Sequence, residues 1–191
     1  MDPGSMSDNS AISNIDVMLI THEHEDHCHL ASIKEILRKS PNAMVVTHEG
    51  VGKILEKEEI GFTRIADGQE ILHGGVAIKS YGTDHACIHH DLPNVQNTGF
   101  MICNTLFYPG DAFHVPPCKV QTLALPVAAP WMRIEEAVEY AKQIMPKTVF
   151  PVHDGMLRPE RLGSTRRVPK IILEPLGITY VDMVEGSVAE F

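Results

Sequence analysis

The chain has 191 residues, 43% of them hydrophobic and 21% charged, which is ordinary for a soluble globular protein, and we expect residues 1–191 to form one domain. No apolar run approaches the roughly 20 residues that a membrane-spanning helix needs. The net charge of −9 argues against non-specific binding to nucleic acid, which depends on neutralising phosphates.

Residues 1–14 are polar and turn-like, and the apolar, β-branched run at residues 15–20 predicts a buried strand. Residues 30–39 carry apolar side chains at helical spacing and predict a helix. Between them, residues 21–29 read Thr-His-Glu-His-Glu-Asp-His-Cys-His, with four histidines and three carboxylates. This polar segment is therefore expected on a loop from strand to helix.

Alternate residues of extended backbone share a face, so His22, His24 and Asp26 are expected to point the same way, with His27 opening the helix beside them. Neutral imidazole and carboxylate are ligands that zinc and similar divalent ions prefer. The alternative is a solvated turn in which Asp26 caps the helix. Capping uses only one residue and does not explain three histidines at positions i, i+2 and i+5. The spacing also differs from the His-Glu-x-x-His motif of helical zinc proteases.

Strands and helices alternate in the first part of the chain, and strands dominate the middle, which favours a layered α/β domain. Further strands are expected at residues 43–47, 76–81, 99–103, 106–108, 122–127, 148–152 and 178–184. Further helices are expected at residues 51–57 and 134–145.

Three of these strands are followed by residues that can bind metal. His85 follows the strand at 76–81, with His89 and His90 further along the same segment. Asp111 follows the strand at 106–108, and His153 follows the strand at 148–152. Each of them alone is an ordinary loop or turn residue. They support a metal site only because they follow the first histidine cluster in this order along the chain.

The pattern His22-x-His24-x-Asp26-His27 after a hydrophobic strand resembles the signature of the metallo-β-lactamase superfamily of binuclear metal hydrolases. The resemblance extends from Asp2 to His153. It implies an α/β fold, an αββα sandwich of the metallo-β-lactamase type. It also implies a ligand set in two groups with a bridge: His22, His24 and His85 for one metal, Asp26, His27 and His153 for the other, and Asp111 between them. His89 is the runner-up to His85.

Two divalent ions in such a site, zinc with manganese or iron as alternatives, would hold an activated hydroxide between them. The resemblance makes Asp26 and Asp111 the catalytic carboxylates, and Asp26 is expected to orient the hydroxide. The oxygen-reducing di-iron branch of the superfamily usually has glutamate where this chain has His24, which favours hydrolysis.

The chain looks most like small members related to L-ascorbate-6-phosphate lactonase. We therefore expect a small, anionic ester, lactone or phosphoester as substrate. The alternatives are a phosphodiesterase or nuclease on the same fold, and a metal-binding remnant without catalysis.

The segment Asp2-Pro3-Gly4 resembles the turn that follows the opening β-hairpin of the family, so the sandwich is expected to lack that hairpin. A second copy of the chain would then cover the exposed strand edge. The alternative is a vector-derived or unstructured tail. The four cysteines form no C-x-x-C pair and no signal peptide precedes them, which predicts a cytoplasmic protein with reduced thiols.

For two features in the last third of the chain, the sequence leaves two roles open. Trp131, the only tryptophan, either lines the substrate pocket or anchors the core. The basic residues of segment 158–170 form either a solvated helix face or an anchor for a phosphate or carboxylate group of the substrate.

Overall fold

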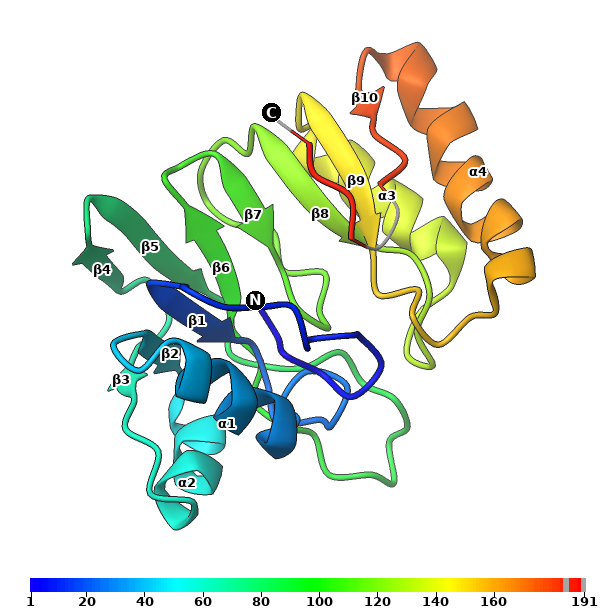
Figure 1. The fold of residues 1–191 in the computed structure, drawn as a ribbon. Coiled ribbons are helices and arrows are strands. Elements are labelled where there is room, and N and C mark those ends of the chain that lie inside the picture. Colours follow the sequence, from blue (N-terminus) through cyan, green and yellow to red (C-terminus); the bar gives the residue numbers. More distant parts are fainter. Residues whose placement is uncertain (184–185, 190–191) are drawn as a thin grey trace.

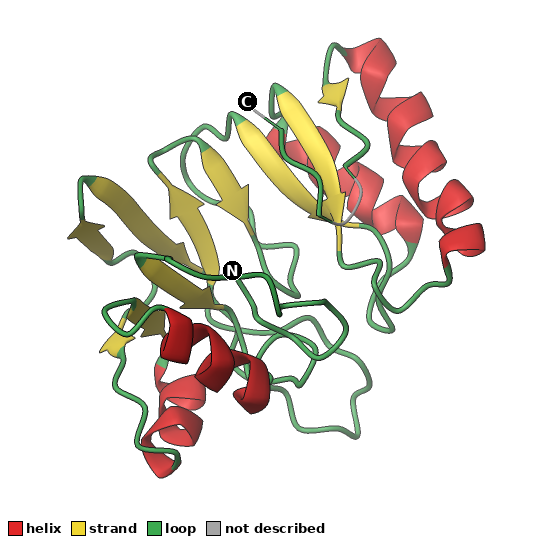
Figure 2. Ribbon diagram, in the orientation of Figure 1, coloured by secondary structure: helices red, strands yellow, loops and turns green. Residues whose placement is uncertain are grey.

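Two β-sheets face each other in the computed structural model, and helices cover the outer face of each sheet (Figures 1 and 2). The structure describes residues 1–183 and 186–189. The layer order of helices, sheet, sheet and helices confirms the αββα sandwich that the family resemblance implies. None of the helices in the described part of the chain is long and apolar enough to cross a membrane.

The smaller sheet is parallel with the order β1-β2-β3, and its strands are Val17–Ile20, Met44–Thr47 and Thr63–Arg64. Helices α1 (Leu30–Lys39) and α2 (Glu49–Lys57) cover its outer face. Helix α1 connects β1 to β2, and α2 connects β2 to β3, as expected for parallel β-α-β connections.

Side-chain alternation along β1 divides the core into two layers. Met18 and Ile20 pack with Ile33 of α1 and the other buried residues on the helix side of the sheet. Leu19, between them in sequence, packs with Phe100 and other residues of the second sheet. Because successive strand residues point to opposite faces, this four-residue strand contributes to both layers. That is why residues 17–20 are apolar without a break.

The larger sheet has the strand order β10-β9-β8-β7-β6-β5-β4. Strands β4 to β7 pair antiparallel, and β7 to β10 pair parallel. In chain order, the strands β4 to β10 are Glu70–His73, Val76–Tyr81, Gly99–Ile102, Leu106–Tyr108, Thr122–Pro126, Thr148–Val152 and Thr179–Tyr180. The helical segments that follow β8 and β9 are α3 (Ile134–Ile144), η1 (Pro159–Arg161), α4 (Leu162–Leu173) and η2 (Glu174–Leu176).

The pairing brings several strand ends to one edge of this sheet. Strand β5 is antiparallel to β6, and β6 is antiparallel to β7, so β5 runs in the same direction as β7, β8 and β9. Loops that leave the carboxyl ends of these four strands therefore gather at a common edge. These loops carry His85, Asp111, Trp131 and His153.

The predicted elements agree with the structure within one or two residues at most boundaries. The helix expected at 30–39 and the strands at 76–81 and 148–152 have the predicted bounds. The strand expected at 178–184 is only Thr179–Tyr180, and Val184 lies outside the described residues. Strands β3 and β4 are short and have no alternating apolar pattern, so pattern reading missed them. Helix α4 agrees with the helix reading of the basic segment 158–170, although Pro169 lies within it.

The N-terminal residues are bound to the free side of β1. The backbone N–H of Asp2 donates to the carbonyl of Leu19 at 2.8 Å, and the N–H of His29 donates to the carbonyl of Pro3 at 3.1 Å. A Cβ on Gly4 would lie 1.7 Å from the carbonyl oxygen of Asp26, so only glycine allows this approach. The alternative of an unstructured tail is therefore wrong for these residues.

Candidate metal centre

The loop after β1 turns sharply and does not continue as a strand. The N–H groups of His27 and Cys28 both donate to the carbonyl of His24, at 2.9 and 2.8 Å. The expectation that His22, His24 and Asp26 share one face of extended backbone is therefore wrong, because the turn separates Asp26 from the two histidines. The expectation that His27 opens the helix is also wrong, since α1 begins at Leu30.

Three imidazole rings from two distant segments form the first triad: His22, His24 and His85. Their ring centroids lie 4.7 to 4.9 Å apart. The Nδ1 of His22 is hydrogen-bonded to the Thr21 hydroxyl at 3.0 Å, and the Nδ1 of His85 to the carbonyl of Ala86, so each ring turns its Nε2 inward. Both Nε2 atoms are buried without a hydrogen-bond partner. Burial, with the charge of His27, lowers the pKa of His22 to about 3, which favours the neutral form that binds metal.

A second triad consists of Asp26, His27 and His153. The Nε2 atoms of the two histidines are 3.0 Å apart, and Asp26 Oδ2 lies 3.8 and 3.5 Å from them. The carbonyl of Ala128 accepts from Nδ1 of His153 at 2.6 Å, which again directs Nε2 inward. His153 has a φ of 63°, a left-handed conformation that few non-glycine residues adopt.

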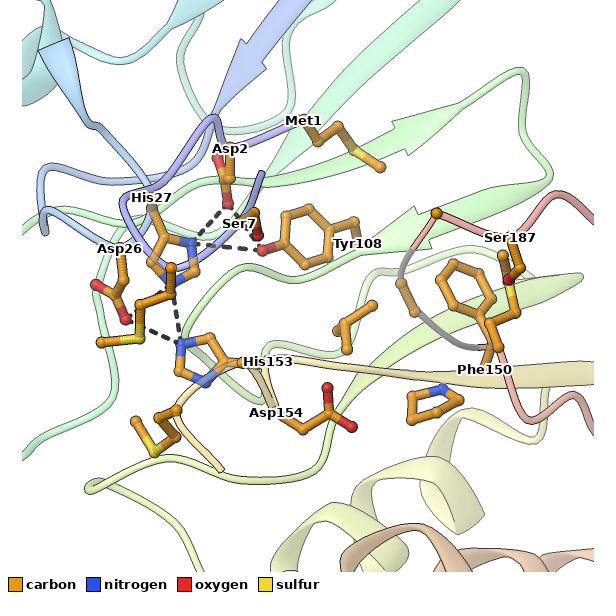
Figure 3. A pocket seen from close by; sticks show the side chains of 18 of the residues that line it. Met1, Asp2, Ser7, Asp26, His27, Tyr108, Phe150, His153, Asp154 and Ser187 are labelled. Carbon is orange, nitrogen blue, oxygen red and sulfur yellow. Dashed lines mark hydrogen bonds and ion pairs between the residues drawn. The ribbon is translucent and has the colours of Figure 1, made fainter. Parts of the chain in front are cut away.

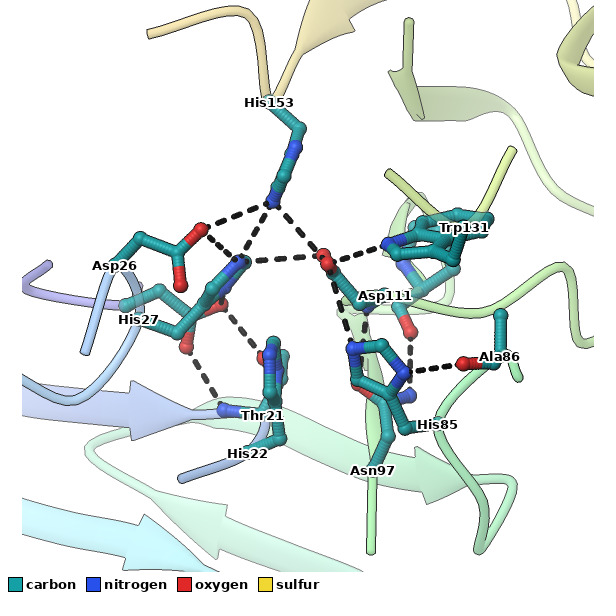
Figure 4. Close-up of polar contacts among 12 residues, drawn as sticks. Thr21, His22, Asp26, His27, His85, Ala86, Asn97, Asp111, Trp131 and His153 are labelled. Atoms are coloured by element: carbon teal, nitrogen blue, oxygen red, sulfur yellow. Dashed lines mark hydrogen bonds and ion pairs between the residues drawn. The ribbon is translucent and has the colours of Figure 1, made fainter. Parts of the chain in front are cut away.

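Asp111 lies between the two triads (Figure 4). Its carboxylate oxygens are 3.2 Å from Nε2 of His27, 3.2 Å from Nε2 of His153 and 3.5 Å from Nε2 of His85. Burial alone would raise the pKa of Asp111, but these three histidines lower it far below its usual value. Asp111 thus contacts both triads and carries a negative charge at neutral pH.

The loop that presents Asp111 is held by a side chain that the sequence analysis did not select. The Oδ1 of Asn97 accepts from the N–H of Asp111 at 3.0 Å, and its amide donates to the carbonyl of Pro109 at 2.9 Å. Gly110 has a φ of 64°, and a Cβ there would lie 2.3 Å from the Asn97 oxygen. Glycine is therefore required at position 110, where the chain turns tightly over Asn97.

A buried carboxylate behind the second triad is the clearest omission of the sequence analysis. Asp2 Oδ2 accepts from Nδ1 of His27 at 2.8 Å and from the hydroxyls of Tyr108 at 2.8 Å and Thr21 at 2.7 Å, while Oδ1 accepts from the N–H of Thr21 at 2.8 Å. Burial alone would raise the pKa of Asp2, but the hydrogen bond and charge of His27 lower it. This arrangement orients His27 in the way that carboxylates orient metal-binding histidines. The Asp-Pro-Gly turn marked the position, but no local pattern links it to His27.

The other histidines of segment 85–91 lie apart from the two triads. His89 and His90 are exposed and group with Asp91. The structure thus brings His85, and not its runner-up His89, to the first triad.

The seven candidate ligands meet the requirements of a divalent-ion site. Within each triad, and within the group of His22, His27 and Asp111, the ligand atoms lie within 4.8 Å of one another. Three of these atoms are buried without a hydrogen-bond partner: Nε2 of His22, Nε2 of His85 and Oδ1 of Asp111. Such buried polar atoms are costly unless something binds them, and imidazole and carboxylate together suit zinc and related ions. The residues present therefore fit a metal centre.

A cavity of about 440 Å³ adjoins the second triad (Figure 3). Phe150 and Val152 of β9 contribute to its apolar wall, and Arg166 of α4 also lines it. The guanidinium of Arg166 donates to Asp154 at 2.6 Å and to Asp182 at 3.0 Å. Because its charge is already paired, Arg166 gives no support to the substrate-anchor reading of the basic segment.

Comparison with known proteins agrees with this geometry. The chain is 30% identical to Protein Rv0786c of Mycobacterium tuberculosis over 168 residues, which cover 85% of this chain and 78% of the relative. It is 26% identical to UPF0173 metal-dependent hydrolase Ta0764 of Thermoplasma acidophilum, over 72% of this chain and 65% of the relative. Among solved structures, Igni18, a metallo hydrolase of Ignicoccus hospitalis, has a similar fold, with a TM-score of 0.73, 22% identity and coverage of 92% of this chain and 80% of that one.

The family described as Beta-lactamase superfamily domain matches residues 1–153, which include all seven candidate ligands. The match ends at His153, the last of them, and spans both sheets up to β9. The chain therefore belongs to the β-lactamase domain superfamily and has the metallo-β-lactamase fold.

Proposed function

We propose that the protein is a metal-dependent hydrolase with a binuclear site, acting on a small, anionic ester, lactone or phosphoester. The observation that carries the proposal is the convergence of seven imidazole and carboxylate side chains, three of which present buried ligand atoms without partners. The similarity to the Thermoplasma relative, which is named a metal-dependent hydrolase, supports the same class of activity.

The proposed ligands divide as the two triads do, with Asp111 shared between them. Zinc is the favoured metal, and manganese or iron is compatible with the same donor atoms. Bound divalent ions would supply an activated water molecule and polarise the scissile carbonyl or phosphoryl group. The protein supports this by keeping His22 neutral through burial and by turning the Nε2 atoms of His85 and His153 inward.

The side chains differ in exposure, which suggests the side from which substrate approaches. The side chain of Asp26 is 24% exposed, whereas those of His27 and Asp111 are 3% and 4% exposed. Asp26 is thus the carboxylate that solvent and substrate reach first. We assign it the role of orienting the attacking water by accepting a hydrogen bond, and we assign Asp111 the role of holding the two halves of the site together.

The preference for an anionic substrate follows from charge. Among the seven proposed ligands only Asp26 and Asp111 carry negative charge, against four positive charges of two divalent ions, so the occupied site keeps a net positive charge. The protein as a whole carries a net charge of −9, which disfavours long polyanions such as nucleic acid. A compact anion that approaches the site locally is the better match.

The first test is the metal content of the purified protein, measured by elemental analysis. Close to two ions per chain supports the complete ligand set and justifies a screen of lactones, thioesters and phosphoesters. One ion per chain supports a half-formed site. No uptake after addition of zinc or manganese would overturn the proposal.

The same screen separates the alternatives. Turnover of a generic phosphodiester without turnover of lactones favours the phosphodiesterase reading. Two bound metals without any turnover favour a metal-binding protein without catalysis.

A further inference from the structure

The indole of Trp131 contacts the central carboxylate of the proposed metal site. Its Nε1–H donates to Oδ2 of Asp111 at 2.6 Å (Figure 4). Trp131 lies in the loop after β8, so this contact joins two strand-end loops of the larger sheet. An indole N–H is a donor only: it neither accepts a hydrogen bond nor binds a metal. The contact is therefore not part of the ligand set described above.

The neighbouring histidines cannot provide the same contact when they bind metal, because a ligating imidazole is neutral. In His27, His85 and His153, Nδ1 faces an acceptor: the Asp2 carboxylate, the Ala86 carbonyl and the Ala128 carbonyl, respectively. A neutral imidazole has one N–H, and these acceptors place it on Nδ1. Once Nε2 of such a histidine binds an ion, it has no proton left to donate to Asp111. Among the side chains that the structure places against the Asp111 carboxylate, the indole is the donor that remains.

The two oxygens of Asp111 consequently have different surroundings. Oδ2 accepts the indole N–H, while Oδ1 is buried, accepts no hydrogen bond and has Nε2 of His27 as a neighbour at 3.2 Å. A carboxylate with one oxygen fixed in this way cannot rotate freely about its last torsion angle. Its orientation is set before any ion arrives, which is the role that hydrogen-bonded neighbours of metal ligands commonly have.

The indole is itself held in place by packing. Its ring lies 5.0 Å from that of Phe113 and 6.1 Å from that of His85, in edge-to-face arrangements. Phe113 also packs on Tyr140 of α3 at 4.9 Å, and the Tyr140 hydroxyl donates to the carbonyl of His114 at 2.6 Å. A row of aromatic rings thus runs from α3 to the Asp111 carboxylate. Trp131 thus contacts both the proposed metal site and Phe113, and it is not among the described residues that line the cavity of about 440 Å³.

We propose that Trp131 is a positioning residue of the metal centre, which fixes the Asp111 carboxylate through its indole N–H and so raises the affinity for divalent ions. The inference rests on the proposed metal-dependent function but concerns a residue outside its ligand set. Loss of a hydrogen-bonding neighbour of a metal ligand typically weakens metal binding about 10- to 100-fold. That is the effect expected from Trp131→Phe, which keeps an aromatic ring and removes the N–H.

The matched control is Tyr140→Phe, which removes an aromatic donor at the other end of the same row of rings, where it bonds to a backbone carbonyl. Zinc affinities of the wild type and both variants are measured by competition with a chromophoric chelator, after circular dichroism has verified folding. We expect Trp131→Phe to lose about 10- to 100-fold and Tyr140→Phe to stay within about threefold of the wild type. Equal affinities for the wild type and Trp131→Phe would overturn the inference.

A second measurement does not depend on the Trp131 variant being stable. Because the chain has one tryptophan, ¹⁵N-labelled protein gives one indole N–H resonance. We expect it downfield in the metal-free wild type, upfield of that position in Asp111→Asn, and still downfield after zinc is added. If the resonance does not shift in Asp111→Asn, or if zinc moves it to the position of a free indole, the Trp131 inference is wrong, but the proposed function is not affected. A wild type that binds neither zinc nor manganese would overturn the proposed function as well.

Discussion

Asp2→Asn removes a negative charge from behind the proposed metal site and leaves the size of the side chain unchanged. In the structure, Oδ2 of Asp2 receives three donors and Oδ1 receives the N–H of Thr21. An asparagine amide has only one acceptor oxygen. If the amide oxygen keeps the bond to His27, the NH₂ group lies against the N–H of Thr21. In the flipped orientation, the NH₂ group lies against the Nδ1–H of His27 instead. The hydroxyls of Thr21 and Tyr108 can rotate, but these two N–H groups cannot.

The magnitude follows from this count. One buried donor left without an acceptor costs about 1–3 kcal/mol, and hydrogen bonds to a neutral amide are weaker than those to a carboxylate. We therefore expect the free energy of unfolding of the metal-free protein to fall by roughly 2–4 kcal/mol. Because the carboxylate also holds the orientation of His27, metal affinity is expected to fall about 10- to 100-fold.

Urea denaturation of the metal-free protein and chelator competition with zinc measure the two effects. The matched control is Asp16→Asn, at an exposed aspartate just before β1, which should change stability by less than about 0.5 kcal/mol. An Asp2→Asn variant with unchanged stability and unchanged zinc affinity would refute the reasoning, because it would show that the buried carboxylate does not organise His27.

Four further outcomes are expected. Asp111→Ala should lose binuclear occupancy, and two metals retained in elemental analysis would contradict its bridging role. His85→Ala should lower the metal content while His89→Ala leaves it unchanged, since only His85 lies in the first triad; the reverse result would reassign the ligand. Phe100→Ala should lower the free energy of unfolding by about 3–5 kcal/mol in urea titrations, because the ring is fully buried between the sheets; a loss below about 1 kcal/mol would contradict that packing. Burial lowers the pKa of His48 from 6.5 to about 4. Between these two pH values the unfolded chain binds a proton that the folded chain does not, so the free energy of unfolding decreases as the pH falls from 6.5 to about 4. His48→Asn, which keeps an N-cap acceptor for α2, should remove up to about 3 kcal/mol of that loss, and identical pH profiles would refute the assignment.

Local patterns were sufficient for most of the secondary structure. Residues 17–20 are apolar on both faces and form a run short enough for a buried strand, and α1 has a clear apolar stripe at helical spacing. The misses have physical reasons as well. Strand β3 has two residues and β4 is half exposed, so neither has a recognisable period. Helix α4 was expected only as one reading of the basic segment and without bounds, because Pro169 within it interrupts the local helix pattern.

The candidate site, too, was predictable from the sequence only in part. The types and chain order of the seven candidate ligands were visible because metal ligands are chemically distinctive and follow strand ends. Their grouping was not, since the turn after His24 places Asp26 with His153, which is more than 100 residues away. Supporting residues such as Asn97 have ordinary side chains, and nothing in their local sequence marks them.

The sequence by itself determined the chemistry of this protein: which atoms can bind a metal, and which strands end beside them, because residue type and periodicity are local properties. Only the tertiary structure decided how those atoms are oriented. Asp2 reaches His27 because the N-terminal segment lies along β1, and Trp131 reaches Asp111 because parallel strands bring their loops to one edge. Hydrogen bonds between segments 20 or more residues apart depend on how the sheets pack, and no local pattern encodes them.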